Sequence, residues 1–278
     1  MATKTSPKVI IGAVVAAVAV VAAVALSGLF NQSASNDTVT AGKLTIGTGN
    51  PAYEPWVVGN KPESGKGFEA AVAYAVAHKL GFADKDVVWV RTSFDEAIAP
   101  GAKNFDFNLQ QYSITDDRKK SVDFSSPYYS TTQTVITIKG SKADGVTTVA
   151  GLKGLVIGAA SATTSYTAIT DVIKPTTQAQ AFNSNDDAKA ALQSGQIDAL
   201  VVDLPTALYL TAVDLTGGKI VGQLPNTAAG DEFGLVLDKG SKLTAKVTEA
   251  VDALRADGTL AAIEKKWLAD YAQAPVLN

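Results

Sequence analysis

The 278-residue chain contains no cysteine, one histidine (His78) and three arginines beside 21 lysines. The absence of cysteine excludes disulfides, thiolate metal sites, a cysteine nucleophile and a lipid attached to a cysteine. One histidine cannot form a histidine cluster for a metal, so we expect neither a metal nor another cofactor. The formal net charge is −3 and there is no basic stripe, so we expect no nucleic-acid partner.

The first 35 residues differ in composition from the rest of the chain. Lys4 and Lys8 precede an uncharged, mainly Val/Ala run over residues 9–30. This run exceeds the ~7–15 apolar residues of a secretory signal and reaches the ~20 that span a bilayer. Residues 1–35 therefore form either a cleaved signal peptide or an uncleaved membrane anchor, and residues 36–42 form a linker. In both cases the lysines favour a cytoplasmic N-terminus, which sends the remainder to the extracellular or periplasmic face.

Beyond the linker, predicted strands alternate with predicted helices. Residues 43–47 and 87–90 have the composition of short buried strands, and residues 67–80 repeat apolar side chains at the i, i+4 spacing of a helix. A β-α-β-α order predicts an α/β fold with mostly parallel sheets and crossover helices. Ligands of such folds bind beyond the carboxyl ends of the strands.

Residues 104–129 contain the most informative stretch of the sequence. Apolar and polar residues alternate over 105–111 as in a strand, and a polar turn follows over 116–120. Arg118 therefore lies just past a strand end. Because a guanidinium matches a carboxylate with two parallel hydrogen bonds, Arg118 is a candidate to bind a small carboxylated ligand. The alternative is a surface arginine paired with Asp116 or Asp117.

Part of this stretch, SITDDRKKSVDFSSPYY, resembles the signature of the amino-acid-binding proteins of ABC importers, the bacterial extracellular solute-binding protein family 3. The pattern of that family is S-[IM]-T-x-x-R followed by V-D-F-S-x-P-Y. This chain supplies Ser113, Ile114, Thr115, Arg118, Val122, Asp123, Phe124, Ser125, Pro127 and Tyr128. The resemblance runs from about Gly42 to Ala272. It implies a solute-binding protein outside the cytoplasm that captures a polar amino acid and delivers it to the membrane permease of an ABC importer.

The same resemblance implies the two-lobed periplasmic-binding-protein type II fold, with each lobe a mostly parallel sheet flanked by helices. We expect the first lobe to comprise residues 43–131 and 230–278, and the second lobe residues 138–229. Two hinge strands, near 132–139 and 230–238, would connect the lobes. We also expect a monomer without enzymatic activity.

The resemblance further implies a site between the lobes. Its expected residues are Asn50, Tyr53, Trp56, Phe94, Gln111, Ser113, Arg118, Thr163, Thr164 and Asp203. Tyr53 and Phe94 would clamp the ligand. Arg118, Ser113 and the helix start at Thr163 would donate to its α-carboxylate, and Asp203 and the Gln111 carbonyl would accept from its α-ammonium.

Plainer structural roles remain open for several of these residues. Trp56 could fill the edge of the core, Phe94 could be the apolar first turn of a helix, and Thr163 and Asp203 could be ordinary helix caps. Many relatives carry an aspartate at position 50, so Asn50 favours a neutral or acidic ligand over a cationic one. An alternative function is an enzyme on the same fold that resembles cyclohexadienyl or arogenate dehydratases. Glu54 would be its only nearby general acid.

Overall fold

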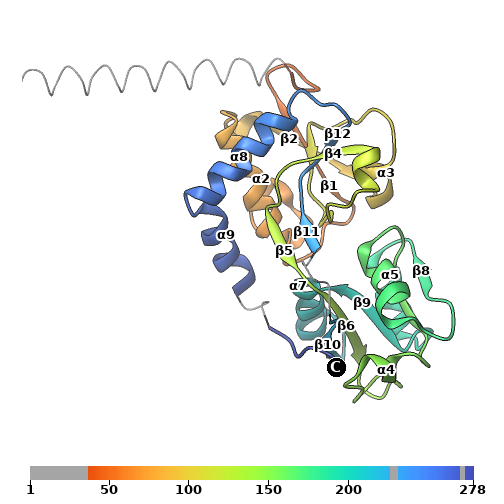
Figure 1. Cartoon of the computed structure of the whole chain (residues 1–278). Helices are drawn as coiled ribbons and strands as arrows, with labels where there is room; N and C mark the ends of the chain where they lie inside the picture. The colour runs from red at the N-terminus through yellow and green to blue at the C-terminus, as the bar shows by residue number, and fades with distance from the viewer. Residues whose placement is uncertain (1–36, 226–230, 270–272) are drawn as a thin grey trace, which may run out of the picture.

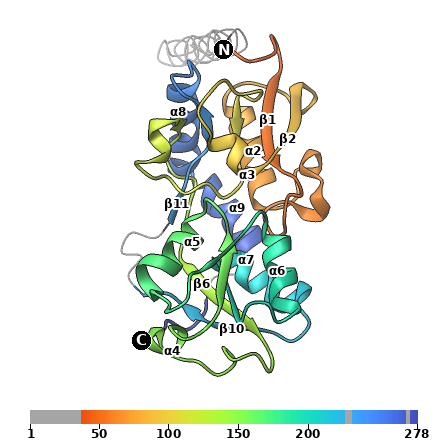
Figure 2. The same cartoon turned by 90° about the vertical axis from the view of Figure 1, so that its right-hand side faces the viewer.

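The computed structural model describes residues 37–225, 231–269 and 273–278, and the expected leader at 1–35 lies outside these residues. Two five-stranded sheets, each flanked by helices, form two lobes that lie one above the other in Figures 1 and 2. The two-lobed α/β fold expected from the sequence is confirmed.

The first lobe is built on a sheet with strand order β2-β1-β3-β12-β4. Its strands are β1 (Leu44–Gly49), β2 (Val87–Thr92), β3 (Phe107–Asn108), β4 (Val122–Phe124) and β12 (Val236–Asp238), and its helices are α2 (Phe68–Lys79), α3 (Phe94–Ile98), α8 (Thr244–Ala256) and α9 (Thr259–Leu268). Helices α2, α8 and α9 pack together over one face of the sheet, and α3 lies on the other face (Figure 1). Val72 and Val76 of α2 are fully buried, as their i, i+4 spacing predicts.

The second lobe is built on a sheet with strand order β10-β6-β9-β7-β8. Its strands are β6 (Gln133–Ile138), β7 (Ile157–Ala160), β8 (Gln180–Phe182), β9 (Ala199–Asp203) and β10 (Gly218–Gln223), and its helices are α4 (Val149–Leu152), α5 (Thr164–Ala168), α6 (Asn185–Gln193) and α7 (Leu204–Tyr209). Helices α4 and α5 cover one face, and α6 and α7 cover the other. Strand β9 is buried along its whole length, which explains its continuous apolar run ALVV.

Both sheets are mixed but mostly parallel, as the sequence predicted, because one strand in each, β12 or β6, runs opposite to the other four. In the first sheet β1 pairs in parallel with β2 and β3, but β12 is antiparallel to β3 and β4. In the second sheet β7 pairs in parallel with β8 and β9, but β6 is antiparallel to β9 and β10. Crossover helices impose parallel pairing only within β-α-β units. Strands β6 and β12 instead enter their sheets after crossing from the other lobe.

Two strands run between the lobes, β5 (Tyr129–Thr131) and β11 (Asp231–Phe233), and they pair antiparallel with each other (Figure 1). The second expected hinge strand, near 230–238, is interrupted at Gly234 and Leu235, between β11 and β12. A Cβ at Gly234 would lie 2.9 Å from Ile114 Cδ1, so a larger residue there would require the Ile114 side chain to shift. The last residues, expected with the first lobe, contact the second. Leu277 is buried in its core and donates its N–H to the Gln223 carbonyl at 2.9 Å.

Candidate ligand site

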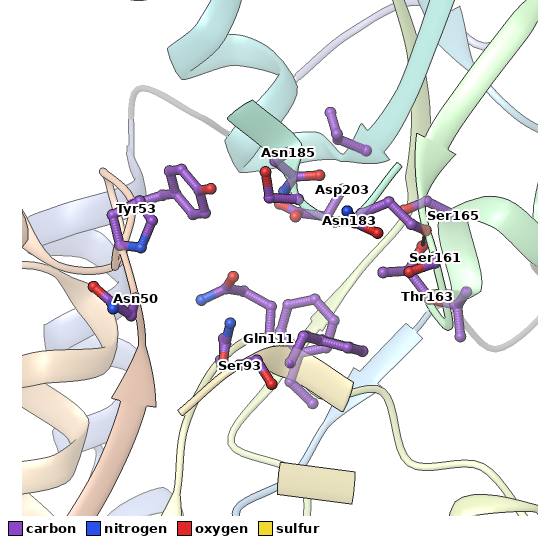
Figure 3. Close-up of a pocket in the computed structure, with 18 of the residues that line it drawn as sticks. Asn50, Tyr53, Ser93, Gln111, Ser161, Thr163, Ser165, Asn183, Asn185 and Asp203 are labelled. Carbon is purple, nitrogen blue, oxygen red and sulfur yellow. Dashed lines mark hydrogen bonds between the residues drawn. The ribbon is translucent and has the colours of Figure 1, made fainter. Parts of the chain in front are cut away.

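A cleft that is partly open to solvent lies between the two lobes and is shown in Figure 3. Its walls are formed where strands end: Asn50 follows β1, Phe94 follows β2, Ser161 follows β7, and Asp203 is the last residue of β9. This is the edge at which α/β sheets bind ligands.

Eight of the ten expected site residues line this cleft. They are Asn50, Tyr53, Phe94, Gln111, Arg118, Thr163, Thr164 and Asp203. The first five come from the first lobe and the last three from the second. The cleft therefore brings together residues that are far apart in sequence and belong to different sheets.

Trp56 and Ser113 do not line the cleft. Trp56 is fully buried and packs edge-on against Phe68 and Phe233, with ring centroids 5.8 Å apart in each pair. Its Nε1 donates to the Thr206 hydroxyl of α7 at 2.9 Å. The structure therefore places Trp56 in the core, where it also joins the lobes, because its large apolar ring is stabilised by burial while its N–H finds a partner. Ser113 is also buried, with its hydroxyl 3.0 Å from that of Thr164.

Arg118 is positioned by carbonyl groups from both lobes. Its Nη1 donates to the Ser113 carbonyl at 2.7 Å, and its Nη2 donates to the Ala162 carbonyl at 2.8 Å. The guanidinium carbon lies 5.3 Å from the centre of the Phe94 ring, within cation–π range. Burial lowers the pKa of Arg118, but an arginine stays charged in proteins.

The surface pairing considered for Arg118 is absent from the described contacts, because its acidic neighbours have other partners. Asp116 pairs with Lys119 at 3.3 Å, and Asp117 pairs with Lys120 at 2.6 Å. A guanidinium has five N–H groups, so Arg118 keeps donors for a ligand after binding two carbonyls.

The second lobe presents a helix start to the same part of the cleft. Thr163 is the N-cap of α5: its hydroxyl accepts from the Tyr166 N–H at 3.2 Å and donates to the Ala160 carbonyl at 2.6 Å. Ala162, directly before this N-cap, adopts a left-handed conformation with φ 55°, and its carbonyl accepts from Arg118.

Asp203 ends β9 and also caps α7. Its Oδ1 accepts from the Thr206 N–H at 2.9 Å, and its Oδ2 accepts from the Thr206 hydroxyl at 2.8 Å. Burial raises the pKa of Asp203 to about 6. A buried carboxylate is stabilised by a cationic partner, and the described residues provide no ion pair for it. Asp203 therefore both caps α7 and lines the cleft.

Glu69, which the sequence did not single out, lies behind the cleft wall and binds the lining residue Gln111. It is 2% exposed and accepts hydrogen bonds from Gln111 N at 2.8 Å, Gln111 Nε2 at 2.5 Å and the Tyr128 hydroxyl. These bonds fix Gln111 in a left-handed conformation with φ 53°. Burial raises the pKa of Glu69 to about 7. An acidic residue in the first turn of an otherwise apolar helix was the available sequence signal.

Several polar residues of the second lobe were also missed. The cleft is lined by Ser161 and Ser165 near α5, and by Asn183, Ser184 and Asn185 between β8 and α6. Tyr53 of the first lobe forms hydrogen bonds with Ser184 and with Asp186, and burial raises its pKa to about 12. The polar run after a predicted strand was a signal, but only the pairing of β8 with β7 places that run at the cleft.

The chain belongs to the bacterial extracellular solute-binding proteins, family 3, whose pattern it matches over residues 44–270. This is the family expected from the sequence motif. Among residues 37–225, 231–269 and 273–278, no helix combines the length and apolar character needed to cross a bilayer. Within the same ranges, His, Asp and Glu side chains form no group that could hold a metal ion.

Curated relatives align over most of their length and are named as amino-acid-binding proteins. The probable histidine-binding protein of Campylobacter jejuni is 30% identical over 88% of this chain and 95% of its own length. The L-cystine-binding protein TcyJ of Escherichia coli K12 is 28% identical over 91% of this chain and 92% of its own. The L-arginine-binding protein of Pseudomonas aeruginosa is 30% identical over 78% of this chain and 84% of its own.

Solved structures of the same family share the fold. An ancestral arginine-binding protein bound to arginine aligns with a TM-score of 0.68 and 33% identity, covering 81% of this chain and 98% of its own. An ancestral amino-acid-binding protein described as a precursor of cyclohexadienyl dehydratase aligns with a TM-score of 0.67 and 29% identity, covering 81% and 95%.

Proposed function

We propose that this protein captures a free polar α-amino acid between its two lobes and delivers it to an ABC importer. The observation that carries the proposal is the placement of Arg118 and Asp203 on opposite lobes of one cleft. An α-amino acid carries one carboxylate and one ammonium, and burying both requires a matched cation and a matched acceptor. Arg118 and Asp203 provide that pair.

Further groups complete the two halves of this site. The backbone N–H groups at the start of α5, after the N-cap Thr163, can donate to the ligand carboxylate, while the Gln111 carbonyl can accept from the ammonium beside Asp203. Because the groups belong to different lobes, a bound ligand stabilises the closed arrangement over an open one. The proposal includes recognition of the closed form by a membrane permease, to which a monomer delivers the ligand.

The lobe boundaries are part of the proposal. We assign residues 43–131 and 231–269 to the first lobe, and residues 138–225 and 273–278 to the second. β5, the start of β6, and β11 then act as the hinge. The N-terminal segment directs the protein across the membrane, and as an uncleaved helix it would also tether it there.

The relatives support an amino acid as the solute and ABC import as the role. Their names specify histidine, cystine and arginine as ligands, and a Bacillus subtilis relative at 29% identity is an ABC transporter glutamine-binding protein. The dehydratase-like alternative is less supported. Its only candidate acid, Glu54, accepts from the Gly59 N–H at 3.0 Å and is not among the described residues that line the cleft.

A thermal-shift screen of the purified chain tests the proposal, with unfolding followed by the fluorescence of its three tryptophans. The ligands are the twenty amino acids, ornithine, cystine and small carboxylates that lack an α-amino group. A ligand at ~100 times its dissociation constant adds ~2.7 kcal/mol of stability. We expect a raised melting temperature with one or a few amino acids, which are recovered unchanged. Stabilisation by carboxylates alone, or chemical conversion of the ligand, would contradict the proposal.

A further inference from the structure

The charged residues that line the cleft are few and are matched in number to the backbone groups of an amino acid. Among the described lining residues, Asp203 is the one carboxylate and Arg118 the one cation. If the proposed function holds, both are used by the α-ammonium and the α-carboxylate. The ligand side chain must then find its partners among uncharged groups.

Figure 3 shows where those partners lie. Ser161 and Thr163 occupy one end of the cleft, next to the Ala162 carbonyl that binds Arg118. Asn50 and Tyr53 occupy the opposite end, with Asn185 facing them from the start of α6. An amino acid whose carboxylate is bound by Arg118 can therefore extend its side chain toward Asn50 and Tyr53.

The positively charged guanidinium of Arg91 lies beside the Asn50 and Tyr53 end of the cleft. Arg91 Nη1 donates to the Gly49 carbonyl and to Asn60 Oδ1, both at 2.7 Å, and Nη2 donates to the Asn60 carbonyl at 2.7 Å. Its guanidinium is therefore held next to the residue that precedes Asn50. A cationic side chain placed there would meet a like charge, which raises the free energy of the bound state.

The carboxylates close to the cleft are already engaged by protein groups. Glu69 binds Gln111 and Tyr128, and Asp231 accepts from the Thr164 hydroxyl at 2.8 Å. Asp186 pairs with Lys189 at 3.1 Å and also contacts Tyr53. None of these three carboxylates is among the lining residues, so none offers a free partner to a ligand cation.

A negatively charged ligand side chain would also lack a charged partner at this end of the cleft. Arg91 is not among the described lining residues, and Arg118 is occupied by the α-carboxylate. Burial of a charge without a partner is strongly unfavourable. A carboxamide avoids this cost, because it donates and accepts at once, as do the amides of Asn50, Gln110 and Asn185.

We propose that the Asn50 and Tyr53 end of the cleft selects an uncharged polar side chain, and that a carboxamide, as in glutamine or asparagine, is the preferred one. The inference rests on the proposed function and narrows it from polar amino acids to neutral amides. It assigns Asn50 as a specificity-determining residue, because Asn50 lines this end of the cleft and directly follows Gly49, whose carbonyl binds Arg91.

Titration calorimetry of the purified full chain with glutamine, asparagine, glutamate, arginine, lysine and leucine tests the inference. We expect glutamine or asparagine to bind at least about tenfold more tightly than the other four. Asn50→Asp places a carboxylate at the far end. It should raise the ratio of arginine affinity to glutamine affinity by about tenfold or more. The control is Asn104→Asp, which makes the same charge change at an exposed position outside the cleft and should leave the ratio unchanged.

The outcomes separate this inference from the proposed function. Tightest binding of arginine, lysine, glutamate or leucine overturns the inference while an amino-acid-binding function stands. A preference for amides that persists unchanged in Asn50→Asp overturns the assignment of Asn50 and of the side-chain end. Failure of every amino acid to bind a correctly folded chain overturns the proposed function itself.

Discussion

Replacing Arg118 with alanine is expected to weaken amino-acid binding by roughly 2–5 kcal/mol, which is about 30-fold to several thousandfold in affinity. The substitution removes the one cation among the described lining residues and leaves the ligand carboxylate buried without a charged donor. Arg118→Lys keeps the charge but loses the planar pair of donors, so its affinity should fall between those of Arg118→Ala and the unmodified chain. Titration calorimetry measures all three.

Arg255→Ala is the matched control for Arg118→Ala. Arg255 lies in α8 and donates to the Pro127 carbonyl, away from the cleft. Its replacement should leave the affinity unchanged. The unliganded melting temperature of Arg118→Ala shows whether loss of the Ser113 and Ala162 contacts disturbs the fold. Near-normal affinity in a well-folded Arg118→Ala protein would rule out Arg118 as the carboxylate partner.

Asp203→Asn is expected to weaken binding by a similar amount, because the ligand ammonium would lose its anionic partner. The fold should survive, since asparagine is as good an N-cap as aspartate and can keep the bond to the Thr206 N–H. Asp198→Asn is the control. Asp198 lies just before β9, equally buried, where it accepts from the Val156 N–H at 2.9 Å far from the cleft.

The raised pKa of Asp203 predicts that ligand binding depends on pH. Burial raises the pKa of Asp203 to about 6, and an ammonium ligand favours the ionised carboxylate. Affinity should therefore be constant above about pH 7 and decline as the pH falls through 6, where the ligand must first displace a proton. Asp203→Asn should bind weakly with no such decline between pH 7 and 5. An equal decline in both proteins would assign the titration to another group.

Local sequence patterns predicted much of the fold. Helix α2 and strand β1 differ from their predicted bounds by one or two residues, because periodicity and capping residues act over a few neighbours. Strand β3 is much shorter than the predicted 105–111. The Gln111 N–H bonds to Glu69 and the residue turns left-handed, so the alternating pattern continues past the end of the ladder.

The sequence predicted those site residues that belong to a recognisable motif. It did not predict residues whose place in the cleft depends on how distant segments of the chain pair. Arg118 and Asp203 follow strand ends, and this is visible in the sequence. The position of Asn183 and Asn185 depends on β8 joining the edge of the second sheet. Trp56 follows Tyr53 on the same loop, but the sequence does not indicate that it turns into the core while Tyr53 faces the cleft. Ala162 adopts a left-handed conformation, but the sequence has no glycine at this position to indicate it.

The central claim is that a zwitterionic amino acid is held between the lobes by Arg118 and Asp203. A crystal structure of the protein with its tightest-binding amino acid tests this most directly. We predict the α-carboxylate oxygens at ~2.7–2.9 Å from the Arg118 guanidinium, the α-ammonium at hydrogen-bond distance from Asp203, and the side chain directed toward Asn50. A ligand bound outside the cleft, or one whose carboxylate and ammonium contact neither Arg118 nor Asp203, would contradict the claim.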